Sequence, residues 1–170
     1  GAPPDSGAIR EPEGADGFSD ITRVSPDGTQ VRELIQPGSS QTVRINPDGT
    51  GFNNIQEPDG SSSRTTYLPD GTQIRETTEP GGSQRREHIS NGSVRTEYID
   101  PSDPTGERIT RVTVHNVSEN GTSSLQLERS FDNQGRVREE ITLNTSGPGY
   151  RVSTFNPNGS RSTRISQQFR

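Results

Sequence analysis

Residues 45–72 read INPDGTGFNNIQEPDGSSSRTTYLPDGT, and the tripeptide Pro-Asp-Gly occurs three times within them. A fourth copy lies upstream at Pro26-Asp27-Gly28, and looser copies continue as far as Pro157-Asn158-Gly159. Over the first part of the chain the spacing is 10 or 11 residues, with glycines at positions 28, 38, 49, 60, 71, 82 and 92. A repeat at a short and nearly constant spacing indicates an array of similar units.

The Pro-Asp-Gly tripeptide has the residue order of a three-residue β-hairpin connection. Proline fixes φ near the value needed at the first corner of a type I turn, and glycine adopts the left-handed conformation that closes a G1 bulge. Strands on either side are antiparallel, and the spacing leaves about seven residues for each. We therefore predict an all-β fold, an antiparallel β-meander of about 11–12 short strands with Pro-Asp-Gly and Asn-Gly hairpin turns. It forms either a thin single-layer sheet or an elongated sandwich.

Apolar residues keep a constant distance from these turns. Two positions before the proline the chain places Val24, Ile35, Ile45 and Tyr67. A stripe at one fixed offset predicts one apolar side of the sheet. Three positions after successive glycines, an apolar residue occurs in every second unit, and a polar residue occurs in the units between them. The apolar residues are Val31, Phe52 and Ile74. This second pattern favours a repeating unit of one hairpin, about 22 residues long.

Hydrophobic residues make up only 21% of the 170 residues, well below the 45–50% or so of an average globular domain. Such a composition is often that of a disordered chain. The regular turns and the β-forming Thr, Val and Ile favour an ordered sheet instead. A thin sheet needs few apolar residues, and other copies of the chain are expected partners because they supply the missing burial.

The charged residues are mixed in sign along the chain, with a net charge of −5, and every basic residue is arginine. Arginine makes planar, bidentate contacts with carboxylates, so we expect the recurring Arg-Glu pairs to bind across strands. A basic patch interleaved with aromatic residues is absent, which argues against nucleic-acid binding. No apolar run approaches the length of a membrane span.

Three regions are expected along the chain. Residues 1–20 contain all three alanines and three of the prolines, and they are expected to form an extended N-terminal arm. Residues 21–100 hold the regular hairpin repeats. Residues 101–170, after a longer loop at 100–106, are expected to be a continuing but less regular β region.

Five Asn-X-Ser/Thr sequons lie at or after residue 91, at Asn91, Asn116, Asn120, Asn144 and Asn158. Each is a candidate N-glycosylation site in a secreted protein. Three of them, Asn91, Asn120 and Asn158, fall at predicted hairpin tips, where a glycan meets no steric obstacle. Because Asn-Gly is also a favoured turn dipeptide, coincidence is the alternative explanation.

Catalytic and metal-binding patterns are not found. An aspartate in every turn resembles the ligand of calcium-binding β-roll repeats, but the spacing and the single aspartate per turn argue against calcium. The two histidines, His88 and His115, have no nearby partner in the sequence for a metal or general-base site. We therefore expect neither an enzyme nor a cofactor.

The motifs at 67–72, 46–50 and 90–93 (YLPDGT, NPDGT and SNGS) resemble the repeat of the centriolar G-box, the C-terminal domain of the centriole-assembly scaffold family and of T-complex protein 10. The likeness covers about residues 20–100. It implies a long, solvent-exposed antiparallel sheet that stacks end to end and binds a proline-rich peptide. The chain lacks the lysines of that family, and its sequons favour the secretory pathway over the cytosol.

The leading hypothesis is a structural, secreted, extracellular protein whose β-sheet protomers assemble into a filament or matrix and carry N-glycans. Residue 1 is Gly rather than Met, so a removed signal peptide is expected. The alternatives are a non-enzymatic binding module for a peptide or carbohydrate, and a cytosolic scaffold like the G-box.

Overall fold

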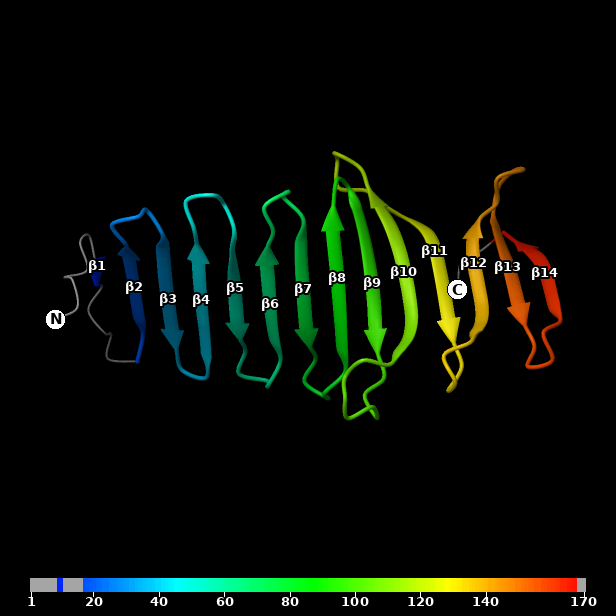
Figure 1. The fold of residues 1–170 in the computed structure, drawn as a ribbon, viewed down its shortest axis with the longest axis horizontal. Coiled ribbons are helices and arrows are strands. Elements are labelled where there is room, and N and C mark those ends of the chain that lie inside the picture. Colours follow the sequence, from blue (N-terminus) through cyan, green and yellow to red (C-terminus); the bar gives the residue numbers. More distant parts are fainter. Residues whose placement is uncertain (1–8, 11–16, 168–170) are drawn as a thin grey trace. The chain divides into compact units, whose positions relative to one another are not determined.

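The computed structural model describes residues 9–10 and 17–167, which form strands and turns without any helix. The chain divides into two compact units, residues 1–83 and 84–170. In each unit the strands are antiparallel and follow one another in chain order (Figure 1). The all-β antiparallel meander predicted from the turns is therefore confirmed.

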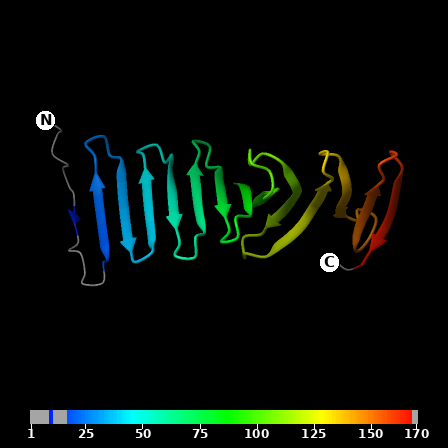
Figure 2. The same ribbon diagram turned by 90° about the horizontal axis from the view of Figure 1, so that it is seen from below.

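The first unit is one open sheet, and Figure 2 shows its strands side by side in one layer. Each described strand contacts only its neighbours in chain order, so no second layer packs on it as in a sandwich. The strands are β1 (Ile9–Arg10), β2 (Ser19–Val24), β3 (Gln30–Gln36), β4 (Ser39–Ile45), β5 (Gly51–Gln56), β6 (Ser62–Tyr67) and β7 (Gln73–Thr78).

The second unit is also a single-layer meander, and its strands are on average longer. They are β8 (Gln84–Ser90), β9 (Ser93–Ile99), β10 (Ile109–Val117), β11 (Ser123–Phe131), β12 (Val137–Leu143), β13 (Tyr150–Phe155) and β14 (Arg161–Ser166). The regularity of the repeat changes only after residue 100, whereas β8 and β9 already belong to this unit.

Fourteen strands are described, more than the 11–12 or so expected. One of them, β1, lies within residues 1–20, the segment expected to be an extended arm, and β2 begins there at Ser19. β1 pairs with β2 at two positions only. The rest of the predicted arm, apart from residues 17 and 18, lies outside the described residues.

The Pro-Asp-Gly turns have the predicted geometry. In the first of them the amide of Gly28 donates a hydrogen bond to the carbonyl of Ser25 at 2.9 Å, and the amide of Ser25 donates to the carbonyl of Thr29 at 2.8 Å. Gly28 has φ +92°, which is the left-handed residue of a G1 bulge. The same pair of bonds closes the turns at 46–50, 57–61, 68–72, 79–83, 118–122, 132–136 and 156–160.

The prediction of one apolar side is wrong. Val24, Ile45 and Tyr67 do share one row of cross-strand partners, separated by Gln30 and Gly51. Ile35 lies five positions along β3 from the Gln30 row, and side chains an odd number of positions apart point to opposite faces. The reason is that successive turns lie at opposite ends of the strands. The residues two positions before the proline therefore belong alternately to two rows that are five positions apart, and these rows lie on opposite faces.

The hairpin of about 22 residues is the repeating unit, as the second pattern indicated. Val31, Phe52 and Ile74 occupy one row, with Arg44 and Thr66 between them. This row is next to the Val24 row along the strands, so it lies on the other face. Both faces of the first unit therefore carry apolar side chains, and neither face is wholly apolar.

Buried apolar side chains are confined to the second unit among the described residues. They are Ile99, Val112, Leu125, Ile141 and Val152. The β10 pairings contain register shifts at 109–111 and 114–115, and the β11 pairing with β12 contains another at 130–131. Such bulges bend and twist a strand, and curvature brings side chains on the inner side of a single layer closer together.

Gly51 offers a test of how tightly the strands approach each other. It has φ +153°, and a Cβ at this position would lie 1.9 Å from the carbonyl oxygen of Arg44 on β4. At Gly49, with φ +84°, a Cβ would meet nothing within 4 Å. We expect Gly49→Ala to cost about 1–2 kcal/mol of unfolding free energy through φ alone.

We expect Gly51→Ala to cost roughly 2–3 kcal/mol more than Gly49→Ala, because β4 has to move to admit the methyl group. Urea unfolding of both variants, followed by circular dichroism, measures the difference. Equal losses in the two variants would show that the register of β4 and β5 is not as described.

Candidate functional site

The aspartate of each Pro-Asp-Gly turn accepts a hydrogen bond from the amide two residues later. The Oδ1–N distances are 2.9 Å from Asp27 to Thr29, 3.0 Å from Asp48 to Thr50, 2.9 Å from Asp59 to Ser61 and 2.9 Å from Asp70 to Thr72. In two turns the hydroxyl of the later residue donates as well, at 2.6 Å. The carboxylates are therefore part of the turn itself.

These bonds favour the charged carboxylate and lower its pKa below the ordinary value. For Asp48 and Asp59 the hydroxyl of Thr50 or Ser61 is the main cause. For Asp27 and Asp70 the main cause is the backbone amide of Thr29 or Thr72. At all four aspartates the amide and the side chain of the residue two positions later both lower the pKa, as expected when polar groups stabilise the ionised form.

Two of the predicted glycosylation sites occupy the position that aspartate has in the Pro-Asp-Gly turns. Asn120 Oδ1 accepts bonds from the amide of Thr122 at 3.0 Å and from the hydroxyl of Ser118. Asn158 Oδ1 accepts bonds from the amide of Ser160 at 3.0 Å and from its hydroxyl at 2.6 Å. The turn bonds thus account for the asparagine at both sites and, through its hydroxyl, for Ser160 of the second sequon.

The other three predicted glycosylation sites have different surroundings. Asn91 is exposed at the β8–β9 tip, with φ +47°, as a two-residue turn of Asn and Gly requires. Asn116 is not at a tip, because it lies in β10, where it is exposed. Asn144 is half-buried in the β12–β13 turn, and its Nδ2, the atom to which an N-glycan attaches, donates to the carbonyl of Pro148 at 3.1 Å.

Arginine–carboxylate pairs do connect neighbouring strands, as the sequence predicted. Arg32 Nη2 lies 2.7 Å from Asp20 Oδ2, and Arg129 Nη2 lies 2.7 Å from Glu140 Oε2. Both arginine side chains are well exposed, at 58% and 40%. Exposed pairs of this kind contribute about 0–1 kcal/mol each, so they add little to the stability of the sheet.

His88 contacts a carboxylate that is distant from it in the sequence. Its Nε2 lies 3.0 Å from Oε1 of Glu97, a side chain on the neighbouring strand β9. Glu97 is buried, with only 8% of its surface exposed, and it needs a polar partner there. Cross-strand register places the two residues on one face, which their separation of nine residues in the sequence does not reveal.

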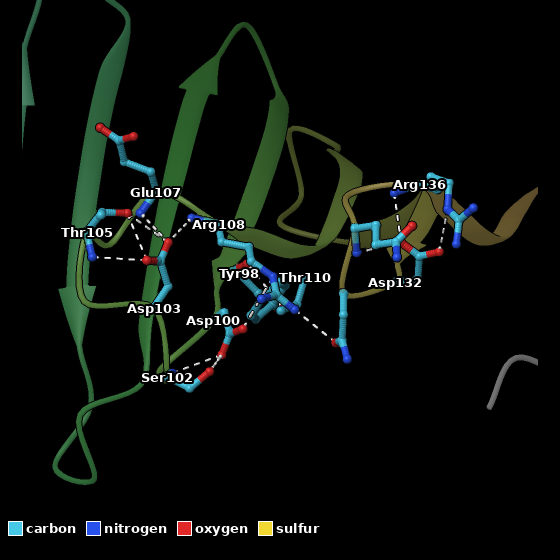
Figure 3. A network of polar contacts seen from close by, with 12 residues as sticks. Tyr98, Asp100, Ser102, Asp103, Thr105, Glu107, Arg108, Thr110, Asp132 and Arg136 are labelled. Carbon is cyan, nitrogen blue, oxygen red and sulfur yellow. Dashed lines mark hydrogen bonds and ion pairs between the residues drawn. The ribbon is translucent and has the colours of Figure 1, made fainter.

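The β9–β10 loop contains a polar network that was not predicted from the sequence (Figure 3). Asp103 accepts bonds from the amides of Thr105, Glu107 and Arg108 and from the Thr105 hydroxyl. The Arg108 side chain lies 3.5 Å from Asp100 and donates to Asn133 of the β11–β12 turn at 2.9 Å. The signal for this network in the sequence is the dipeptide Asp-Pro, which occurs twice, three residues apart.

Most of the hydrogen bonds to the Asp103 carboxylate come from backbone amides of the same loop. The network therefore holds the loop in one conformation. Within residues 9–10 and 17–167, no three His, Cys, Asp or Glu side chains gather as potential ligands of a metal ion. Nor do the described residues include a helix that could cross a membrane.

An open pocket of about 570 Å³ lies in the second unit, at the ends of β12 and β13. Its lining combines apolar groups with two arginines, and the residues are Asp132, Arg136, Val137, Arg138, Thr154, Phe155, Asn156, Pro157 and Gly159. Arg136 is bound to Asp132 at 3.0 Å. Arg138 is exposed, and no described residue makes an ion pair or hydrogen bond with its side chain.

The last strand of the second unit has an open side. β14 pairs with β13 along its whole length, from the pair Arg161 and Phe155 to the pair Ser166 and Tyr150. No other described strand pairs with β14. Five of its six residues are exposed, and Ile165 exposes 47% of its surface. An exposed edge strand presents unpaired amides and carbonyls that can receive another strand.

No protein-family model and no curated protein matches the chain.

The turn aspartates predict how stability depends on pH. Because the folded-state pKa of Asp48 and Asp59 is lowered, their contribution is present at neutral pH and is lost as the pH falls from about 3.8 through the folded pKa. Asparagine keeps the Oδ1 acceptor and does not titrate. We therefore expect the double variant Asp48→Asn, Asp59→Asn to lose less of its thermal stability between pH 5 and pH 2 than the unmodified protein.

Circular dichroism melts over this pH range measure the effect. The matched control is Glu57→Gln, which removes a carboxylate of the 57–61 turn whose side chain bonds to no described residue. This variant should keep the original pH profile. An identical acid response of the double variant and the unmodified protein would mean that the turn bonds do not depend on the charge.

Proposed function

We propose that this protein is a structural, non-enzymatic, extracellular protein whose β-sheet protomers assemble through their edges into a filament or matrix. The observation that carries the proposal is the open strand β14, exposed along five of its six residues. Strand addition to such an edge pairs backbone groups of two chains whatever their side chains. No catalytic constellation is needed for this role.

The thinness of the sheets supports assembly. The buried apolar side chains of the described residues number five, and none of them belongs to the first unit. A single layer leaves both faces in contact with water, so a second copy is the simplest source of further burial. Exposed apolar side chains remain in both units, including Ile35 at 46% and Ile165 at 47%.

Charge favours one polarity of assembly. Residues 1–30 contain six acidic residues and two arginines, a net charge of −4, whereas residues 141–170 contain four arginines and no acid, a net charge of +4. Opposite charges on the two ends of the chain favour head-to-tail contacts and disfavour contacts between like ends. A head-to-tail contact that does not close on itself produces a filament.

Glycans are the second part of the proposal. Asn91, Asn120 and Asn158 are exposed at turns and Asn116 is exposed near the end of β10. Sugars at turn tips project along the strand direction, away from the lateral edge where another strand is added. A G-box-like cytosolic scaffold shares the assembly mode but excludes glycans, so the two proposals are separated by mass measurement.

We expect Ile165→Lys to weaken assembly at least tenfold, because a charge on an edge strand opposes the approach of another strand. Sedimentation velocity gives the association constant, and electron microscopy of negatively stained samples shows whether filaments form. The matched control is Ile35→Lys on the interior strand β3, where the isoleucine is equally exposed. This control should assemble like the unmodified protein.

Two results would contradict edge assembly. A monodisperse monomer at high protein concentration would remove the proposal itself. Loss of assembly in Ile35→Lys, with Ile165→Lys unaffected, would transfer the contact from the sheet edge to a sheet face.

For the glycans, we expect protein secreted from eukaryotic cells to carry sugars at Asn91, Asn120 and Asn158, with Asn144 the least occupied. The reason is the hydrogen bond from Asn144 Nδ2 to Pro148 and the partial burial of that side chain. Intact mass before and after enzymatic deglycosylation, with peptide mapping, measures occupancy. Thr122→Ala should remove the Asn120 glycan alone, and native material without any glycan would favour the cytosolic scaffold.

A further inference from the structure

The pocket at the ends of β12 and β13 has an apolar interior and a basic rim. Val137, Phe155 and Pro157 contribute the apolar groups, and Arg136 and Arg138 contribute the charge. Pockets lined in this way, with a few placed polar groups, are typical of binding sites.

The two arginines differ in what they can offer a ligand. Arg136 is already paired with Asp132, at 3.0 Å. The Arg138 side chain has no partner among the described residues and is exposed. Its guanidinium is therefore available for a carboxylate, with which arginine forms bidentate bonds. Arg161 adds a further positive charge nearby, because it is the cross-strand partner of Phe155.

A ligand that matches these features has an apolar side chain and carboxylates within a short distance of each other. The volume of about 570 Å³ holds a short peptide segment rather than a single side chain. The chain contains such a segment at residues 11–18, Glu-Pro-Glu-Gly-Ala-Asp-Gly-Phe, which carries three carboxylates and ends at Phe18. Phe18 exposes 39% of its surface, so the ring is available to another molecule.

We propose that this pocket binds residues 11–18 of a second copy of the chain, with Phe18 against Phe155 and the glutamates beside Arg138. This inference rests on the proposed assembly and names its anchoring contact. An added edge strand alone provides only backbone bonds of modest net strength. A buried aromatic ring next to a charge pair is the kind of contact that dominates interfaces, and it selects the acidic end of one copy for the basic end of the next.

The test is titration of a fluorescent peptide of residues 10–20 into the full-length protein, followed by fluorescence anisotropy. We expect saturable binding that weakens as salt is raised. Phe18→Ala in the peptide should weaken binding at least tenfold, because the ring no longer enters the pocket. Arg138→Glu in the protein should also weaken it at least tenfold, since the charge opposite the glutamates is reversed.

Two controls separate a local effect from a loss of folding. Arg151→Glu reverses another exposed arginine, on β13, that does not line the pocket, and this variant should bind the peptide normally. A peptide with Glu11→Arg and Glu13→Arg should bind the Arg138→Glu protein better than the unmodified protein. Restoration by this charge exchange cannot arise from a misfolded variant.

The outcomes distinguish this inference from the proposed function. Absence of peptide binding, or binding that Arg138→Glu does not change, overturns the pocket contact even if Ile165→Lys still abolishes assembly. Peptide binding with the expected charge dependence, in a protein that never assembles, keeps the pocket as a site for acidic peptides and overturns the filament.

Discussion

The fold depends on one local interaction, the pair of hydrogen bonds that closes each five-residue turn around a left-handed glycine. In the turn of Gly28 these bonds join Ser25 to Gly28 and to Thr29. Each turn fixes the register of the two strands that it connects, since loop length and turn type determine pairing in hairpins. Within each unit every pairing is between consecutive strands, so a chain with few apolar residues reaches its sheet through local contacts.

A sheet organised by its turns does not need a large core, and the two units show this to different degrees. Among the described residues, the buried apolar side chains all lie in the second unit, including Ile141 at 3% exposure and Val152 at 4%. These two are cross-strand partners in the β12–β13 ladder. Among the strand residues of the first unit whose burial the structure describes, Thr65 alone is buried. The stability of the first unit therefore depends on turns and cross-strand pairs, and this combination leaves large surfaces exposed.

Features that depend on residues close together in the sequence were predicted correctly. Features that depend on contacts between residues far apart in the sequence were not. Turn geometry and antiparallel order followed from Pro-Asp-Gly alone. The single apolar side was wrong because the face of Ile35 depends on the alternation of turns between the strand ends. The contact of His88 with Glu97 depends on cross-strand register, and the bond from Arg108 to Asn133 joins two different turns. The pocket around Phe155 requires the turns 132–136 and 156–160, which are separated by two strands in the sequence, to lie together.

The turns also explain why a sequon in this chain has two meanings. At Asn120 and Asn158 the hydrogen bonds of the turn account for the asparagine, and at Asn158 a bond from the Ser160 hydroxyl accounts for the serine as well. The Asn158 motif would therefore be present without any glycan. Asn116 is different, because it lies in β10 and makes no turn bond that would select it. Glycan occupancy at Asn116 is therefore the stronger evidence for a secreted protein. Sugars there and at the tips would leave the lateral edge of β14 open, so glycosylation and edge assembly are compatible in one molecule.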